Sequence, residues 1–277
     1  MRALKTIFDF YINSSIHVAL AIVAMTCITY LEFEVSFDLN VLSFVGFASI
    51  TGYNFVKYFG LAKFHHRSLS NKLKIIQVFS LACFLVMCFF ALQLNKASLI
   101  AILIFGAITF LYAIPLLPNR FFLDKKKQLR SISGLKIYII AIVWCGVTVI
   151  LPMINKELEL QHDIIVSAIQ RFIFVIVLMF PFEIRDVNYD SLKLSTIPQR
   201  IGVKQTKVIG VILLILIMCL EFFKHDIHIG HVISLTITVL ATLMFLKYAT
   251  IQQGTYYSAF WVESLPILWL ILLLMLS

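Results

Sequence analysis

The chain has 277 residues, of which 61% are hydrophobic and only 13% are charged, and its mean hydropathy is +0.98. A soluble globular domain has roughly one half apolar and about a quarter charged residues, so this composition excludes that class and indicates a membrane protein. The formal net charge of +9 does not call for nucleic acid as a partner, because membrane orientation and anionic lipid explain a basic excess.

Long apolar segments recur along the whole sequence, and each has the length of about 20 residues that a helix needs to cross a bilayer. A transmembrane β-barrel is excluded because these segments do not alternate between polar and apolar residues. We therefore predict an all-α polytopic membrane protein with about nine transmembrane helices. The predicted spans are 14–31, 41–60, 74–94, 98–117, 135–152, 164–181, 207–223, 229–249 and 257–276.

The first span is interpreted as a retained helix and not as a removed signal peptide. Arg2 and Lys5 precede it, but the polar residues 13–15 interrupt its start, and no small-residue cleavage site follows the apolar run. We expect residues 1–277 to form a single membrane-embedded domain.

Basic and acidic residues separate between alternate loops. Most of the 23 lysines and arginines lie near the N-terminus and in the loops around 57–74, 120–136 and 185–207. The opposite loops carry mainly acids, namely Glu32, Glu34, Asp38, Glu157, Glu159, Asp163 and Asp226. By the positive-inside rule the basic side is cytoplasmic, which predicts a multi-pass inner-membrane (cell membrane) protein with its N-terminus in the cytoplasm and its C-terminus outside.

Three carboxylates lie together in the sixth loop, at Glu183, Asp186 and Asp190. Spacings of three and four residues place them on one face of a helix that continues past Pro181. Clustered carboxylates repel one another unless a cation neutralises them, and with phosphate oxygens they are typical ligands of Mg²⁺. The alternative is a hydrated interfacial helix whose acids pair with its own basic residues.

The wider segment carries a resemblance to a known family. "RDVNYD" (185–190) followed by "STIPQRIG" (195–202) resembles the second aspartate-rich motif of the UbiA superfamily of intramembrane prenyltransferases. "LYAIPLLP" (111–118), "GLKIYIIAIVW" (134–144) and "YYSAFWVESLP", which contains Glu263, resemble further family segments. The resemblance implies a nine-helix bundle with a cytoplasmic polar cap over an apolar cavity.

The first aspartate-rich motif of that family departs from the pattern. It is expected at the cytoplasmic end of the second helix, where this chain reads "YNFVKYFGLA". Asn54 matches its first position, but the aspartate positions hold Phe55, Tyr58 and Ala62. In the second motif Leu194 stands where a glycine is usual.

The resemblance implies a function and a set of site residues. The function is Mg²⁺-dependent transfer of a prenyl group from a prenyl diphosphate to a lipophilic acceptor, either aromatic or lipid, within the lipid bilayer. Asp186 and Asp190 are the candidate catalytic residues and metal ligands, with Glu183 and Asn54 as supporting ligands. The candidate residues for binding the diphosphate are Lys57, Arg130, Lys136, Arg185 and Lys193.

Two alternatives remain open, and in the first of them the chain has kept the fold but acts on another lipid-diphosphate substrate. A chain without the first motif can be a non-catalytic membrane protein of the UbiA fold that binds or assembles, because a fold does not fix a function. A solute transporter is disfavoured, because the polar cluster lies at one face and not at a broken helix in the middle of the membrane. The acceptor, the prenyl chain length and the oligomeric state are not encoded in any pattern of the sequence.

Two further polar residues fall inside predicted spans. Arg171 lies in the sixth and Glu263 in the ninth, and ionisable residues within a membrane are usually paired or face a cavity. We expect these two residues to pair with each other inside the bundle. His17, in the first turn of the first span, is expected to form an interior hydrogen bond.

Overall fold

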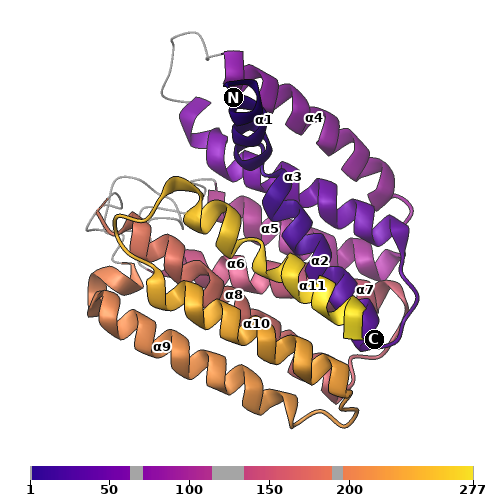
Figure 1. Cartoon of the computed structure of the whole chain (residues 1–277). Coiled ribbons are helices and arrows are strands. Elements are labelled where there is room, and N and C mark those ends of the chain that lie inside the picture. The colour runs from indigo at the N-terminus through magenta and orange to yellow at the C-terminus, as the bar shows by residue number, and fades with distance from the viewer. Residues whose placement is uncertain (1, 63–70, 114–133, 189–195, 277) are drawn as a thin grey trace, which may run out of the picture.

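The computed structural model describes residues 2–62, 71–113, 134–188 and 196–276, and every described element is helical (Figure 1). The α-helices are α1 Arg2–Asn13, α2 Ile16–Glu32, α3 Leu39–Ala62, α4 Asn71–Ala91, α5 Lys96–Ala113, α6 Leu135–Cys145, α7 Leu151–Asn155, α8 His162–Asp186, α9 Ile197–Glu221, α10 Ile229–Tyr248 and α11 Leu265–Leu276. Two wider π-helical turns, η3 (Gly146–Ile150) and η4 (Tyr257–Val262), precede α7 and α11.

Each of the nine predicted spans overlaps a helix or a helix interrupted by a π turn, and residues 114–117 of the fourth span lie outside the described residues. Eight helices of the described chain are long and apolar enough to cross a membrane, and α1 with α2, bent by 56°, makes a ninth crossing if the two are counted as one. The multi-pass membrane fold is therefore confirmed. Helix α1 was not among the predicted elements, because its polar residues break up the apolar run that marks a span.

The helices form a closed arrangement in which neighbours in sequence are mostly neighbours in space. Helix α2 packs on α3, α6 on α8, α8 on α9, α9 on α10, and α10 on α11, and α11 returns to pack on α2 (Figure 1). Helix α8 lies inside this arrangement, because 78% of its apolar stretch is buried, compared with 11% for α4. The helix that carries the carboxylates is thus the most enclosed of the predicted spans.

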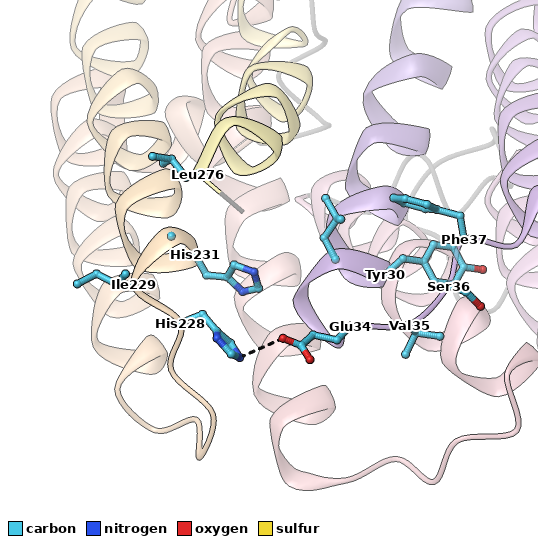
Figure 2. Close-up of a pocket in the computed structure, with 11 residues that line it drawn as sticks. Tyr30, Glu34, Val35, Ser36, Phe37, His228, Ile229, His231 and Leu276 are labelled. Carbon is cyan, nitrogen blue, oxygen red and sulfur yellow. Dashed lines mark ion pairs between the residues drawn. The ribbon is translucent and has the colours of Figure 1, made fainter.

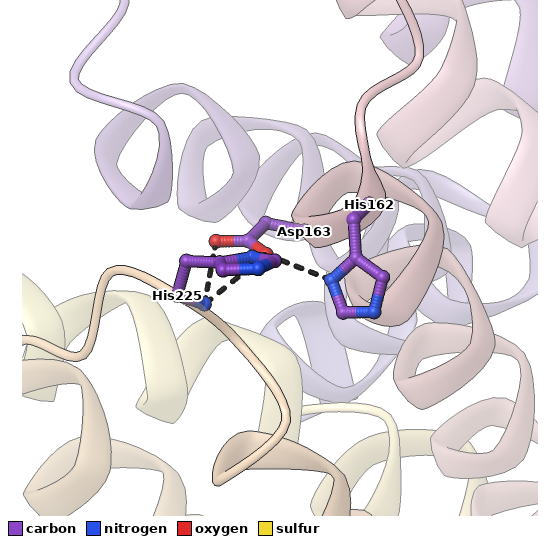
Figure 3. Close-up of side chains that lie close together, drawn as sticks. All are labelled: His162, Asp163 and His225. Atoms are coloured by element: carbon purple, nitrogen blue, oxygen red, sulfur yellow. Dashed lines mark hydrogen bonds and ion pairs between the residues drawn. The ribbon is translucent and has the colours of Figure 1, made fainter.

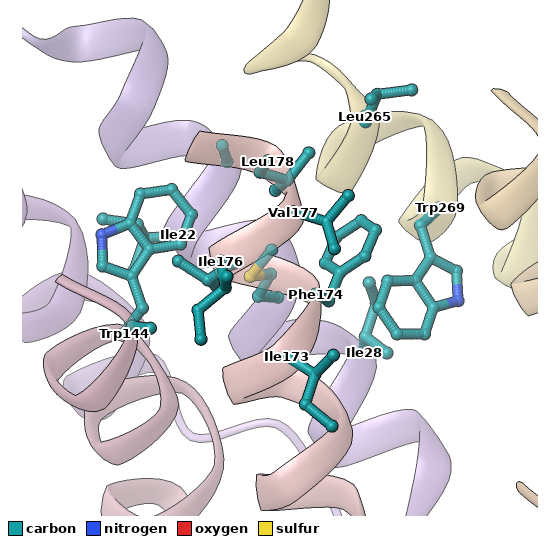
Figure 4. Close-up of a cluster of buried hydrophobic side chains, with 14 of the residues drawn as sticks. Ile22, Ile28, Trp144, Ile173, Phe174, Ile176, Val177, Leu178, Leu265 and Trp269 are labelled. Carbon is teal, nitrogen blue, oxygen red and sulfur yellow. The ribbon is translucent and has the colours of Figure 1, made fainter. Parts of the chain in front are cut away.

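The main hydrophobic core surrounds α8. Phe174 and Val177 of α8 lie on the side of Trp269 of α11, while Ile176 of α8 lies on the side of Ile22 of α2 and Trp144 of α6 (Figure 4). The rings of Phe174 and Trp269 meet edge to face, with centroids 5.4 Å apart. Close packing of large side chains on all sides of one helix fixes its position along and around its axis, and so fixes the position of the residues at its end.

Two helix boundaries near the site differ from the predicted ones. Helix α8 continues five residues beyond Pro181, so Glu183 and Asp186 are helical as the carboxylate argument required. Helix α9 begins at Ile197, ten residues earlier than predicted, and is broken at Gly202, whose φ of 83° and ψ of 158° suit glycine. Because most of residues 199–207 are polar, this first part of α9 does not form the apolar run that predicts a transmembrane span.

Loops predicted to share a side of the membrane lie together. At one end of the bundle, Asn155 donates a hydrogen bond to Asp38 at 3.0 Å, and Lys156 donates to Ser36 at 3.1 Å. At the other end, the Tyr58 hydroxyl donates to the backbone carbonyl of Asn13 at 2.9 Å. We refer to these as the acidic end and the basic end, after the charges that their loops carry.

His17 forms the interior contacts expected for it. Its Nδ1 lies 2.7 Å from the Tyr11 hydroxyl, and its Nε2 lies 2.9 Å from the backbone carbonyl of Phe260. These bonds tie α1, α2 and the turn η4 together at the basic end. The prediction of a hydrogen-bonded interior histidine is confirmed.

Candidate functional site

The carboxyl end of α8 carries two of the predicted site carboxylates at the basic end of the bundle. Both carboxylate oxygens of Asp186 accept hydrogen bonds from Arg185, from Nε at 2.7 Å and from Nη2 at 3.1 Å. The two side chains are 23% and 28% exposed, so Asp186 and Arg185 form a paired group at the rim of the bundle.

Glu183 lies one turn earlier and is completely buried. Its Oε2 accepts a hydrogen bond from the backbone N–H of Ile197, at the start of α9, at 3.3 Å. The same turn of α9 is closed by a capping box between Thr196 and Gln199, and the Gln199 amide donates to the Val187 carbonyl at 2.9 Å. Glu183 and this capping box therefore hold the end of α8 against the start of α9.

Asn54, on α3, lies in a buried hydrogen-bond network with the α1–α2 junction. Its Nδ2 donates to the Ser14 carbonyl at 2.9 Å and to Ser80 at 2.7 Å, while its Oδ1 accepts from Ser15 at 2.9 Å. This amide joins α3 to α2 and α4. Its carbonyl oxygen retains a second lone pair, which is the acceptor that a metal ion would use.

The charges of Lys57 on α3 and Arg185 at the end of α8 both act on the carboxyl group of Glu263. The Lys57 ammonium donates a hydrogen bond to the Ser15 hydroxyl at 3.0 Å. Glu263 directly follows the π-helical turn η4, a kind of helix irregularity that is frequent at functional sites. The Tyr53 hydroxyl accepts a hydrogen bond from the Trp144 indole at 2.8 Å, which joins α3 to α6.

The positions of the degenerate first motif are used for packing. The ring of Phe55 stacks on Phe110 with centroids 6.2 Å apart, and Tyr58 binds the α1 backbone as described above. Neither side chain offers the carboxylate oxygens that the family motif would supply at these places. The described part of α3 therefore contributes Asn54 and Lys57 to the candidate site.

Of the remaining predicted site residues, one lies within the described part of the chain and three lie outside it. Lys136 lies partly buried in the first turn of α6. Helix α6 and its continuation run antiparallel to α8, which places Lys136 at the basic end with Asp186. Asp190, Arg130 and Lys193 lie outside the described residues.

The donors at the end of α8 are compatible with a hard divalent cation. Mg²⁺ prefers carboxylate oxygens and waters, and it retains several waters when it binds to protein. Asp186 is a partly exposed carboxylate, and Glu183 lies one turn away on the same helix. Arg185 competes for both oxygens of Asp186, so metal binding there requires this pair to open.

The expected pair between Arg171 and Glu263 is wrong. Arg171 is buried towards the acidic end, where its Nη2 lies 3.9 Å from a carboxylate oxygen of Glu32 and its guanidinium lies 4.7 Å from the centre of the Trp269 ring. Because α8 is longer than predicted, Arg171 is about 22 Å from the helix end that carries Asp186. Glu263 lies at the basic end with Lys57 and Arg185 instead.

A pocket of about 700 Å³ opens at the acidic end, away from these carboxylates (Figure 2). Its lining includes Tyr30, Glu34, Phe37, His228 and His231. The imidazole of His228 points across the pocket to Glu34, with the nitrogen 3.8 Å from the carboxylate oxygen. This pocket has no residue in common with the predicted diphosphate site.

One solved structure has the same helical architecture as this chain. No protein-family model and no curated protein matches the sequence. The structure is similar to a solved structure of digeranylgeranylglyceryl phosphate synthase in membranes, with a TM-score of 0.59. The match covers 99% of this chain and 98% of the other, at 16% sequence identity.

The chain has the UbiA fold. The matched enzyme is a prenyltransferase of that superfamily, so the fold expected from the motif at 185–202 is confirmed. At 16% identity the comparison establishes the architecture alone. In this UbiA fold the end of α8 with Glu183 and Asp186, the start of α9 and the cationic residue Lys57 lie at the same end of the bundle.

Sequence reasoning missed one residue that supports this end of the fold. The side chain of Gln253 donates to the Pro181 carbonyl at 2.9 Å and also to Ser258 in η4. It thereby connects α8 to the turn that precedes Glu263. No motif marks Gln253, since a single glutamine in a polar loop carries no periodic or compositional signal.

Proposed function

We propose that the protein transfers a prenyl group from a prenyl diphosphate to a lipophilic acceptor, aromatic or lipid, in the membrane. The observation that carries this proposal is the architecture shared over 99% of the chain with digeranylgeranylglyceryl phosphate synthase. The polar group at the end of α8 supports it, because it combines carboxylates with cations at one end of an apolar bundle.

In this proposal Asp186 and Asp190 hold Mg²⁺, with Glu183 and Asn54 in support. When bound, Mg²⁺ supplies positive charge that stabilises the departing diphosphate. The basic residues proposed to bind the diphosphate oxygens are Lys57, Arg130, Lys136, Arg185 and Lys193. Catalysis then depends on charge stabilisation and on positioning of the ionised prenyl chain next to the acceptor.

Arg185 has a specific place in this scheme. Its guanidinium is held by two hydrogen bonds to Asp186, so it is oriented before any ligand arrives. A planar guanidinium has five N–H donors and can bind phosphate through two parallel hydrogen bonds. We propose that diphosphate binding draws Arg185 away from Asp186 and frees that carboxylate for the metal.

We also propose that the basic end faces the cytoplasm of a cell whose inner membrane holds the protein. The N-terminus then lies inside and the C-terminus outside. The argument is the positive-inside rule applied to loops that share one end of the bundle. A prenyl diphosphate is water-soluble at its head, so it would reach the site from the cytoplasm.

A second candidate function is a non-catalytic membrane protein of the same fold that binds or assembles. The observation that favours it is the use of first-motif positions for packing, with Phe55 stacked on Phe110 and Tyr58 bonded to the α1 backbone. Such a protein would retain the helical bundle but lack the acidic ligands of the first aspartate-rich motif.

Thermal unfolding of the purified chain with geranyl or farnesyl diphosphate tests the proposal. We expect the diphosphate to raise Tm only when Mg²⁺ is present, and we expect Asp186→Asn to abolish that rise. Glu34→Gln, at the acidic end, is the matched control and should respond like the wild type. No rise with either diphosphate, or an equal rise in Asp186→Asn, would contradict the proposal.

Product formation separates the two candidate functions. The wild-type chain is incubated with radiolabelled prenyl diphosphate, Mg²⁺ and a lipid extract of its own cells. Transfer of label into the lipid phase, absent in Asp186→Asn, supports the enzyme. Mg²⁺-dependent binding without transfer under the same conditions supports the binding protein.

A further inference from the structure

Two histidines and one aspartate meet at the acidic end of the bundle (Figure 3). His162 and Asp163 begin α8, and His225 lies in the segment between α9 and α10. The Nδ1 atoms of His162 and His225 lie 3.1 Å and 2.8 Å from the same oxygen of Asp163. One ligand atom from each of the three residues lies within 4.8 Å of the other two.

The carboxylate of Asp163 is fixed in place by the backbone. The N–H of His225 donates to its two oxygens at 3.2 Å and 3.0 Å, and the N–H of Asp226 donates to Oδ2 at 3.3 Å. Asp163 is 17% exposed, while the side chains of His162 and His225 are 55% and 74% exposed. A fixed acid is thus flanked by two imidazoles that have room to rotate.

We propose that His162, Asp163 and His225 bind a divalent transition-metal ion of the zinc type. Imidazole nitrogen favours Zn²⁺, Ni²⁺ and Cu²⁺ over Mg²⁺ and Ca²⁺, and two of the three ligands are imidazoles. Ligands that bind one zinc at about 2 Å lie within about 4 Å of each other, so small rotations of the exposed rings complete the set. The ion replaces the N–H protons that the two imidazoles otherwise direct at Asp163.

This site is separate from the proposed diphosphate site. Asp163 and Asp186 are at opposite ends of α8, and 23 intervening steps of about 1.5 Å place them about 35 Å apart. Two of its ligands, Asp163 and His225, are 62 positions apart in sequence. A bound ion would therefore link the start of α8 to the segment between α9 and α10, and would stabilise the folded bundle.

Metal binding to the full-length chain tests this proposal. The protein is purified with a tag that contains no histidine, treated with a chelator and titrated with Zn²⁺ against a competing indicator dye. We expect one strongly bound equivalent, a rise in Tm on binding, and no competition from millimolar Mg²⁺. His225→Gln and His162→Gln should each weaken zinc binding at least about tenfold.

Two further variants complete the design. His228→Gln, which removes a histidine outside the cluster, should bind zinc like the wild type, and so should Asp186→Asn. The proposal is overturned if the wild type binds no zinc, if His225→Gln binds it unchanged, or if His228→Gln or Asp186→Asn weakens it equally. Because His162 and His225 are exposed, these glutamine variants are expected to fold, and their Tm without metal checks this.

Discussion

Glu32, at the end of α2, is surrounded by donors from the other side of the bundle. The Lys224 ammonium lies 2.6 Å from its Oε1, Ser167 donates to the same oxygen, and Arg171 approaches within 3.9 Å. Burial disfavours the charged ammonium of Lys224, but the carboxylates of Glu32 and Glu221 outweigh burial and raise its pKa above the usual value. The group holds two acids and two bases, so its charges balance.

Glu32→Gln should strongly destabilise the protein. The substitution removes the carboxylate that neutralises the buried cations Arg171 and Lys224. Removing one partner of a buried ion pair costs about 3–5 kcal/mol of folding free energy. Thermal unfolding in detergent measures the loss as a lower Tm. Glu34→Gln, two residues away with an exposed side chain, should leave Tm nearly unchanged, and equal effects of both variants would contradict this prediction.

Asn54→Leu should also destabilise the protein, by about 3 kcal/mol. The leucine leaves the Ser14 carbonyl and the Ser15 and Ser80 hydroxyls without their amide partner, and each unsatisfied buried group costs about 1–3 kcal/mol. Ser80→Ala removes a single bond of the same network and should cost less. If both variants unfold at the wild-type temperature, Asn54 does not hold α3 to α2 and α4 in the way described.

At the scale of the element, the π turn η3 places a glycine against a neighbouring helix. A Cβ atom added to Gly146 would lie 2.1 Å from the ring of Phe105 on α5. Such a distance is far below van der Waals contact, so only glycine fits this crossing unless the ring moves. Close approach of α5 and η3 therefore depends on this residue.

Gly146→Ala should lower stability by about 1–3 kcal/mol, since added volume in a well-packed interior forces side chains from their preferred positions. Gly106→Ala, one residue from Phe105, is the matched control because a Cβ there meets no atom within 4 Å. That substitution should preserve or slightly raise Tm, because alanine favours a helix over glycine by about 1 kcal/mol. The opposite ranking of the two variants would refute the packing argument.

At the scale of the whole molecule, charge differs between the two ends of the bundle. Acidic and amide side chains connect the loops at one end, and among the described residues Lys57, Lys136, Arg185 and Lys204 lie on helices at the other. The rule that places basic loops in the cytoplasm then orients all helices together, because each loop's side follows from the number of crossings before it.

Cysteine labelling measures this orientation. In a variant without native cysteines, Glu34→Cys at the acidic end should react with a membrane-impermeant maleimide added to intact cells from the outside. Lys204→Cys, exposed at the basic end, should react only after the membrane is permeabilised. The reverse pattern would show that the site faces away from the cytoplasm.

Much of the fold could be predicted from the sequence because bilayer crossing imposes a length and a polarity on each helix. The nine apolar runs marked the helices, and the spacing of Glu183 and Asp186 correctly required α8 to pass Pro181. Polar helical segments were missed, namely α1 and the first part of α9. The start of α9 does carry a local signal, the capping box of Thr196 and Gln199, but a search for apolar runs does not include it, and its contact with Glu183 of α8 depends on tertiary structure.

The sequence by itself determined the membrane class, the helical spans and the carboxylate face of α8, since these depend on composition and on periodicity along one chain. Only the tertiary structure decided which charges meet. Arg171 and Glu263 are both polar residues in apolar spans, yet one lies beside Glu32 and the other lies where the charges of Lys57 and Arg185 act on it. Pairing depends on the height of each residue along its own helix and on the neighbour that packing places beside it, and both are set by contacts between segments distant in sequence.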